Sequence, residues 1–128
     1  MELRADDQEA LEQLGRATEV RAEGGFVTVV IHDFPMPEGI EPRATALLLR
    51  LPPGFPDAAP DMFWVDPPVR GPGGSAIPGT ESTQTLLDRT WQRWSRHIQD
   101  QWRPGIDNLA TYLAYVRRCL NQAAGRAA

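Results

Sequence analysis

Proline-rich breaks divide the middle of this 128-residue chain into short apolar runs. The runs cover residues 26–31, 44–51 and 62–65. The first break holds Pro35, Pro37 and Pro42, and the second is the corner LPPGFPDAAP, residues 51–60. Proline lacks a backbone N–H and fixes φ, so neither break continues a strand. Short connections between such runs predict an antiparallel meander.

A further strand precedes the first run. Thr18 and Val20 alternate with charged residues, which is the period of a strand. The pair Gly24-Gly25 then interrupts the chain before the next run and predicts a hairpin. The expected sheet is therefore a four-stranded antiparallel meander.

A helical period occurs near each end of the chain. Apolar residues at helical spacing lead up to Gly15, the expected end of a short N-terminal helix for which Asp6 or Asp7 is the expected cap. The C-terminal stripe consists of Ile106, Leu109, Leu113, Val116 and Leu120. This stripe predicts an amphipathic helix packed on the sheet, so the expected fold class is α+β.

A long loop is expected over residues 66–85, which are rich in proline and glycine. Loops of this length inside one domain are usually functional or mobile. The chain length fits one domain, which we assign to residues 1–122. Residues 123–128, AAGRAA, have no apolar anchor and are expected to fray.

The charge distribution bears on partners and location. Residues 1–66 hold 13 acidic residues and 5 arginines, whereas residues 67–128 hold 4 acidic residues and 8 arginines. The net charge of −4 argues against nucleic-acid binding. No apolar run reaches the roughly 18 residues of a membrane helix, and the polar start is unlike an export signal, so we expect a cytoplasmic protein without membrane contact.

No cofactor or metal site is expected from the motifs. The histidines are His32 and His97, and the single cysteine, Cys119, is distant from both. Three such residues do not form a metal-ligand pattern, and no nucleotide-binding loop is present. Cys119 lies beside the apolar helical stripe, which favours a buried structural role.

Residues 89–103 combine tryptophan with arginine. The tryptophans are Trp91, Trp94 and Trp102, and the arginines are Arg89, Arg93, Arg96 and Arg103. Core packing explains the tryptophans first, and arginines often stack on tryptophan for structural reasons. The alternative is a partner-binding surface, in which the tryptophans support a flexible peptide tail and the arginines recognise a carboxylate or an acidic surface.

Two motifs and their order resemble the ubiquitin-conjugating enzymes. LPPGFPDAAP followed by MFWVDPP resembles that family's proline corner after its third strand, and QDQWRPGIDNLATYL resembles its tryptophan-x-proline turn into a helix. With RTWQRWSRH, these segments more closely resemble prokaryotic family E of the group. The resemblance implies a ubiquitin-conjugating-like (UBC-like) fold with a long active-site loop. It also implies a bacterial protein whose partners are a ubiquitin-like protein and a ThiF-type activating enzyme.

The chain departs from the family at the catalytic position. The family's cysteine lies about eight residues before the tryptophan that matches Trp102, and here that position falls at Trp94 or Ser95. The family's histidine-proline-asparagine motif also has no counterpart. Ser95 is therefore the candidate nucleophile, His97 is its candidate base, and Arg96 or Arg93 would stabilise the oxyanion. Ser95 and His97 can cooperate only in an extended or irregular stretch.

Two interpretations remain open. In the first, the protein is a transferase that carries the modifier as a Ser95 oxyester. In the second, it is a non-catalytic scaffold that binds a ubiquitin-like protein or its activating enzyme through its acidic half and the basic segment 89–103.

Overall fold

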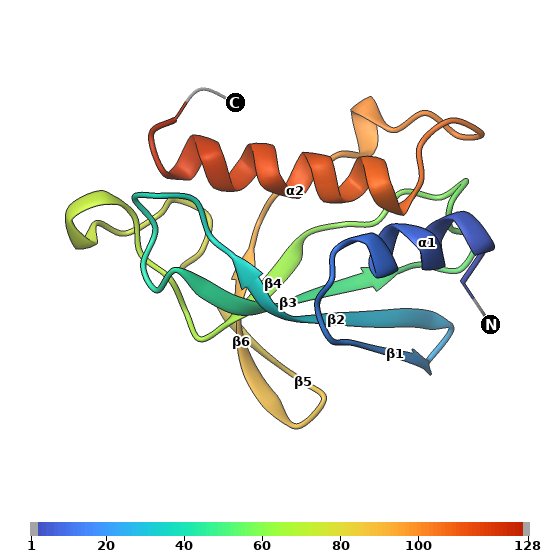
Figure 1. Ribbon diagram of the computed structural model, residues 1–128, viewed down its shortest axis with the longest axis horizontal. Helices are drawn as coiled ribbons and strands as arrows, with labels where there is room; N and C mark the ends of the chain where they lie inside the picture. Colours follow the sequence, from blue (N-terminus) through green and yellow to red (C-terminus); the bar gives the residue numbers. More distant parts are fainter. Residues whose placement is uncertain (1–2, 127–128) are drawn as a thin grey trace.

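Residues 3–126 are described by a computed structural model, in which two helices accompany a six-stranded antiparallel sheet (Figure 1). The elements are α1 (Ala5–Gln13), β1 (Thr18–Glu23), β2 (Phe26–Pro35), β3 (Ala44–Leu51), β4 (Phe63–Asp66), β5 (Thr83–Leu86), β6 (Arg89–Trp94) and α2 (Leu109–Ala123), with 3-10 turns η1 (Pro72–Gly74) and η2 (Gln99–Gln101). The expected α+β class, with one helix towards each end, is confirmed.

The sheet has two more strands than the sequence predicted. Its order is β1-β2-β3-β4-β6-β5, so the predicted meander β1 to β4 is present and a hairpin of β5 and β6 extends it. The expected loop over residues 66–85 therefore ends at β5, which starts at Thr83. The hairpin turn contains Leu87 and Asp88 with φ angles of 53° and 59°. Such turns favour Asn-Gly, and the pair Leu-Asp gives no turn signal.

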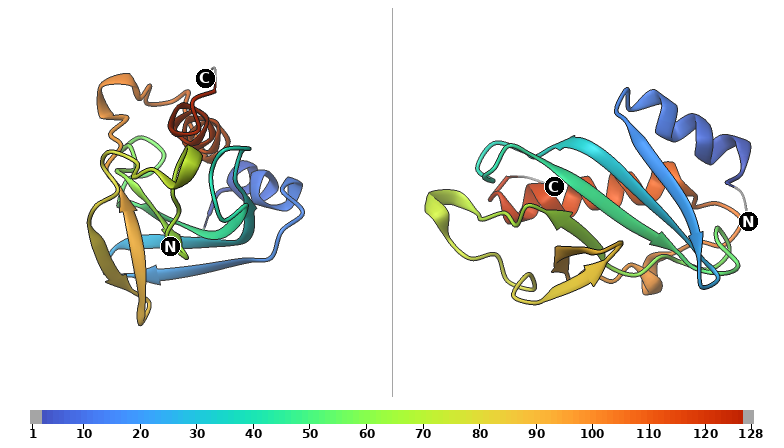
Figure 2. Two further views of the ribbon diagram at one scale, coloured as in Figure 1. Left: turned by 90° about the vertical axis from the view of Figure 1, so that its left-hand side faces the viewer. Right: turned by 90° about the horizontal axis from the view of Figure 1, so that it is seen from below.

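Apolar side chains cover both faces of the sheet. The larger cluster lies between the sheet and the helices and includes Leu11 of α1 and Val116 of α2. Figure 2 shows α2 running across this face of the sheet. The smaller cluster contains Val30, Ala46, Leu48, Trp64 and Trp91, against which Met62, Leu86 and Leu87 pack. The β5–β6 hairpin thus contributes to a second apolar layer.

Asp7 contacts the other helix instead of capping its own. Helix α1 follows Arg4, has no side-chain cap, and ends before Gly15, close to the expected stop. Asp7 is buried, and its Oδ1 accepts a hydrogen bond from the backbone N–H of Leu109 at 3.1 Å. The first N–H groups of a helix have no partner within the helix, so the Asp7 oxygen satisfies one of them. The expectation that Asp6 or Asp7 caps α1 was wrong.

Helix α2 begins later than the apolar stripe suggested. Asn108 caps it, accepting from the N–H of Thr111 at 3.1 Å, while the Thr111 hydroxyl accepts from the Asn108 N–H at 2.9 Å. Ile106 is 63% exposed and lies in the turn before the helix, so its inclusion in the buried stripe was wrong. The rest of the stripe, Leu109, Leu113, Val116 and Leu120, is buried.

The helix extends to Ala123, one residue beyond the expected domain boundary, and Ala124 is 8% exposed. Residues 127–128 of the expected frayed tail lie outside the described residues. No helix among residues 3–126 is long and apolar enough to cross a membrane.

Candidate functional site

Ser95 lies at a tight turn directly after β6. The backbone N–H of Arg96 donates to the carbonyl of Trp94 at 3.0 Å, which closes a three-residue turn around Ser95. The N–H of Ser95 donates to the carbonyl of Gly79 at 2.8 Å, in the loop that leads to β5. These two bonds fix the backbone of Ser95, whose side chain is only partly buried.

The turn brings Ser95 and His97 together. Ser95 Oγ lies 3.1 Å from His97 Nε2, and His97 Nδ1 lies 2.6 Å from Oδ1 of Asp61. A carboxylate only accepts hydrogen bonds, so in the neutral imidazole Nδ1 carries the proton and Nε2 accepts from the Ser95 hydroxyl. The three side chains therefore form a hydrogen-bonded relay from the Ser95 hydroxyl through His97 to the Asp61 carboxylate. This arrangement is typical of a nucleophile, a base and an orienting carboxylate.

The relay is open to solvent. The side chains of His97 and Asp61 are 55% and 47% exposed. At this exposure the ion pair that forms when His97 is protonated contributes little to stability. The imidazole and the carboxylate are therefore in contact with solvent, whereas Ser95 is partly buried.

Two irregular segments hold Asp61 against His97. The backbone N–H of Met62 donates to the carbonyl of Arg96 at 3.1 Å. Gln99 Nε2 donates to the Pro60 carbonyl at 3.4 Å, beside the His97–Asp61 contact. The proline corner and the segment after β6 are thus joined along their length, and this pairing positions the relay.

Met62, which follows Asp61, also helps to hold the proline corner against the segment after β6. It has a φ of 61°, in the left-handed region that a non-glycine residue rarely occupies. Its carbonyl accepts from the Tyr112 hydroxyl of α2 at 2.6 Å. A strained conformation persists only where surrounding contacts determine it, and here both backbone groups of Met62 are bonded.

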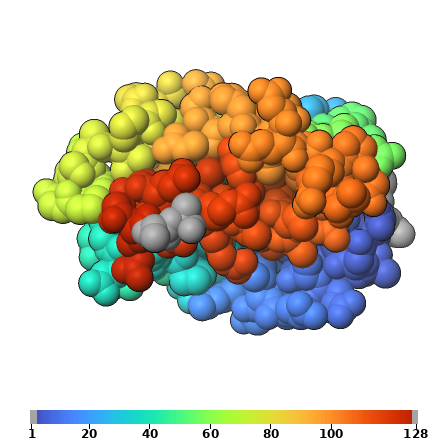
Figure 3. Space-filling view, turned by 90° about the horizontal axis from the view of Figure 1, so that it is seen from above, coloured from blue at the N-terminus to red at the C-terminus, as the bar shows by residue number. Residues whose placement is uncertain are grey.

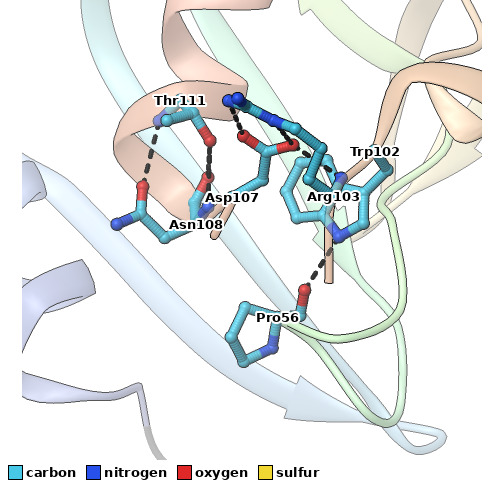
Figure 4. A network of polar contacts seen from close by, with 6 residues as sticks. All are labelled: Pro56, Trp102, Arg103, Asp107, Asn108 and Thr111. Atoms are coloured by element: carbon cyan, nitrogen blue, oxygen red, sulfur yellow. Dashed lines mark hydrogen bonds and ion pairs between the residues drawn. The ribbon is translucent and has the colours of Figure 1, made fainter. Parts of the chain in front are cut away.

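Trp102 fixes the far end of the same segment. Its indole N–H donates to the Pro56 carbonyl at 2.8 Å, and the neighbouring Arg103 binds Asp107 at 2.9 Å (Figure 4). Arg103 also donates its backbone N–H to the Asp107 carboxylate at 2.8 Å. The pKa of Asp107 is lowered, mainly by the hydrogen bond from Arg103. The segment that carries the relay is therefore anchored directly before α2 starts.

Arg96 supplies the cation nearest to Ser95. Its Nη1 donates to the Ser95 carbonyl at 3.1 Å, and its guanidinium carbon lies 5.0 Å from the centre of the Trp94 ring. Gly79 leaves room for it, because a Cβ at that position would lie 2.6 Å from Arg96 Nη1. Arg96 takes part in no ion pair with another residue of the described range 3–126.

Arg93 and Arg89 have different surroundings. Arg93 lies in β6, and its buried Nε has no hydrogen-bond partner among residues 3–126. Arg89 donates its Nε to Asp66 at 3.2 Å and lies 4.6 Å from the centre of the Trp91 ring. Of the two arginines considered for the oxyanion, the structure joins Arg96 to Ser95 by a hydrogen bond and shows no such bond for Arg93 within this range.

The three tryptophans are part of the packed interior. Trp91 and Trp94 are 0% exposed and Trp102 is 8% exposed. Trp91 donates to the Leu86 carbonyl at 2.9 Å, and Trp94 stacks on Phe63 with centroids 5.2 Å apart. Full burial with bonded indole N–H groups supports the core-packing interpretation that the sequence left open. Arg89 lies over the Trp91 ring and Arg96 over the Trp94 ring.

Cys119 is placed as a structural residue. Its side chain is 4% exposed, and burial raises the pKa of its thiol. A thiol with a raised pKa is a poor nucleophile because the thiolate is the reactive form. Within residues 3–126 no three His, Cys, Asp or Glu side chains gather as a metal site.

Two depressions are found on the surface of the molecule. A groove of about 1130 Å³ runs between the turn holding Gly39 and Pro42 and the loop holding Gly71 and Thr80. A smaller pocket of about 320 Å³ is lined partly by Asp61. Figure 3 shows the orange segment after β6 lying along α2, with the yellow loop beside it. Of the three relay residues, Asp61 borders the smaller pocket, and none lines the larger groove.

Asp61 is the site residue that sequence reasoning missed. It follows the proline corner and precedes β4, 36 positions before His97, and no motif links the two. From the sequence, Ser95 and His97 could cooperate only in an extended or irregular stretch, and the turn after β6 meets that condition. The third partner follows only from the way the corner folds back.

The fold and site define an α+β protein with a solvent-open serine–histidine–aspartate relay at the end of a strand. The model of prokaryotic E2 family E matches residues 3–123, so the chain belongs to this family. Membership associates the chain with a UBC-like, conjugation-related role. Neither the curated proteins nor the solved structures include a match.

Proposed function

We propose that this UBC-like protein accepts a ubiquitin-like protein from a ThiF-type activating enzyme and carries it as a Ser95 oxyester. The observation that carries this proposal is the hydrogen-bonded series Ser95–His97–Asp61, with contacts of 3.1 and 2.6 Å. Membership of prokaryotic E2 family E supports the choice of partners. The position of Ser95, before the tryptophan-x-proline turn, supports its role as the nucleophile.

The relay can perform the transfer as follows. Ser95 Oγ attacks the carbonyl carbon of the modifier's C-terminal thioester on the activating enzyme, and the Ser95 proton moves to His97 Nε2. The carbon–sulfur bond breaks, and the departing thiolate takes the proton from His97. Arg96, whose guanidinium already bonds the Ser95 carbonyl at 3.1 Å, supplies positive charge near the oxyanion.

A positioned base is what a serine requires for this reaction. A serine hydroxyl is a weak nucleophile at neutral pH, and a general base contributes about 10²- to 10⁴-fold in rate. Asp61 holds the imidazole in the tautomer whose Nε2 can accept that proton. The relay would thereby supply the activation that a serine needs in place of the family's cysteine.

Incubation of the protein with its activating enzyme, ATP and ubiquitin-like protein tests the proposal. We expect a covalent adduct that resists thiol reductants, is cleaved by alkali and is absent from Ser95→Ala. Ser82→Ala is the matched control, because Ser82 is exposed and lies one residue before β5. An adduct that persists in Ser95→Ala, or stable binding without an adduct in the wild type, would contradict the proposal and favour the non-catalytic scaffold.

A further inference from the structure

The exposed relay would also allow water to hydrolyse an ester carried on Ser95. His97 and Asp61 are about half exposed, so water can approach the base that a protein acceptor would use. We propose that this protein is also a hydrolase of activated carboxylic esters and thioesters, acting through an acyl-Ser95 intermediate. The inference rests on the proposed role of Ser95 as the nucleophile, and it requires neither the modifier nor the activating enzyme.

The acylation step uses the contacts already present. Ser95 Oγ forms a bond to the ester carbonyl carbon, and its proton passes to His97 Nε2, 3.1 Å away. The bond from that carbon to the leaving oxygen or sulfur breaks. The leaving group takes the proton from His97 and departs as an alcohol, phenol or thiol.

The deacylation step uses the same base. His97 Nε2 removes a proton from a water molecule, which attacks the acyl carbon while the Ser95–acyl bond breaks. The proton returns from His97 to Ser95 Oγ, and the carboxylic acid is released. No oxidant, reductant or further reactant takes part. Asp61 is a positioning residue in both steps because it contacts His97 and does not touch the substrate.

The surroundings of Ser95 limit the substrates to good leaving groups. The backbone N–H groups of Ser95 and Arg96 already donate to the Gly79 and Trp94 carbonyls, so neither is available to an oxyanion. The side chain of Arg96 can donate to the oxyanion. One such donor typically contributes about 10²- to 10³-fold in rate, and the two backbone N–H groups add nothing to it. Aryl esters and thioesters need less stabilisation than amides, so we assign the activity to them.

Hydrolysis of p-nitrophenyl acetate and butyrate by the purified protein alone tests the inference. The chain contains no lysine, so acylation of side-chain amines does not obscure the result. We expect Ser95→Ala to abolish the catalysed rate and His97→Gln to lower kcat about 100-fold. We expect Asp61→Asn to lower kcat about tenfold with KM unchanged, because a half-exposed carboxylate orients the imidazole less strongly than a buried one.

The other histidine–carboxylate pair provides the control. His32 Nε2 lies 2.6 Å from Glu19, and both side chains are partly exposed, so His32→Gln removes a similar pair far from Ser95. We expect His32→Gln and Ser82→Ala to retain the wild-type rate. Mass spectrometry of protein quenched in acid should place the acyl group on the peptide that contains Ser95.

The outcomes distinguish the two proposals. An ester-hydrolysis rate that Ser95→Ala leaves unchanged, or an acyl group on another residue, would overturn the hydrolase inference. An alkali-labile modifier adduct with no ester hydrolysis would overturn it too, while the proposed transfer function stands. Ester hydrolysis that depends on Ser95, without a modifier adduct, would support the hydrolase inference and contradict the proposed transfer function. Comparable hydrolysis of p-nitroacetanilide would contradict the restriction to activated esters.

Discussion

His97 Nδ1 lies 2.6 Å from Oδ1 of Asp61, although 36 positions separate the two residues in the chain. The contact exists because the proline corner and the segment after β6 lie against each other, with Met62 bonded to Arg96 between them. Neither segment is a helix or a strand at this point. The relay therefore depends on loops that are held by backbone bonds and by the indole of Trp102.

Replacing Asp61 tests the relay in its proposed transfer role. We expect Asp61→Asn to slow formation of the modifier adduct about tenfold, because an amide can present its NH₂ group to Nδ1 and favour the wrong tautomer. Asp61 is an exposed residue, so the free energy of unfolding should change by less than about 0.5 kcal/mol. Single-turnover kinetics and urea denaturation measure the two effects. Asp57→Asn, an exposed change in the same corner, should leave both values unaltered.

Gly79 is predicted to control the position of Arg96. A Cβ there would lie 2.6 Å from Arg96 Nη1, so Gly79→Ala should displace the guanidinium and slow adduct formation as much as Arg96→Ala does. Gly79 also has a φ of +83°, which costs a non-glycine residue about 1 kcal/mol. Gly73→Ala is the matched control, because Gly73 has a φ of +67° with no atom within 4 Å. Equal adduct kinetics in the two variants would argue against a role for Arg96.

Gln92 is predicted to stabilise the start of the long loop. Its side chain accepts from the Val69 N–H and donates to the Val69 carbonyl, both at 3.1 Å, and both bonds are buried. Gln92→Leu leaves these two backbone groups unpaired, so the free energy of unfolding should fall by about 3 kcal/mol. Gln84→Leu removes one bond, from the Trp64 indole, and should cost about 1 kcal/mol. Urea denaturation of both variants provides the comparison.

Asp7 is predicted to cost stability at neutral pH. Burial raises the pKa of its carboxyl above the ordinary value of 3.8. The native state therefore binds this proton more tightly than the unfolded chain does. The bound proton therefore stabilises the native state fully below pH 3.8, and this stabilisation is lost as the pH rises through the native pKa of Asp7.

Two substitutions of Asp7 separate its charge from its hydrogen bond. Asp7→Asn keeps an oxygen for the Leu109 N–H without a buried charge, so we expect it to be more stable than the wild type at neutral pH. Asp7→Ala leaves that N–H unpaired and should lose about 1 to 3 kcal/mol. The advantage of Asp7→Asn should vanish in urea denaturation at acidic pH. An Asn variant less stable at neutral pH would contradict the assigned cost of the charge.

Cys119 is predicted to take no part in the chemistry. Because burial raises the pKa of its thiol, the native protein should react with a thiol reagent far more slowly than the protein unfolded in urea. Cys119→Ala should form the alkali-labile adduct at the wild-type rate. An adduct that a thiol reductant releases, and that this variant lacks, would instead assign the modifier to Cys119.

Strong local patterns made much of the fold predictable. The run predicted over residues 44–51 coincides with β3, because an apolar segment between proline breaks has few alternatives. Four residues of the predicted stripe are buried in α2, whereas Ile106 is exposed and precedes the Asn108 cap. Tyr112 is also buried in α2, although the predicted stripe did not include it. The sequence signals a helix face more strongly than the position at which the helix begins.

The parts that were missed depend on tertiary contacts. Strand β5 carries only partly buried or exposed side chains, and its turn at Leu87 and Asp88 lacks the usual residues, so local pattern did not reveal the hairpin. Ser95 and His97 could be proposed because they are close in sequence. Asp61 could not, because the distance between two loops is decided by the packing of Trp102 and Tyr112 beneath them.

The hydrogen bond between Asp7 and the first residue of α2 joins residues that are 102 positions apart. During synthesis on a ribosome, Asp7 emerges long before the N–H group that it binds. Until α2 has left the exit tunnel, the sheet lacks the helix that covers its larger apolar cluster. Over the same interval the Asp7 carboxylate lacks the Leu109 N–H that it binds in the folded protein. A nascent chain stopped before Leu109 would therefore present that apolar face to chaperones, and the larger cluster would be covered only once α2 is released.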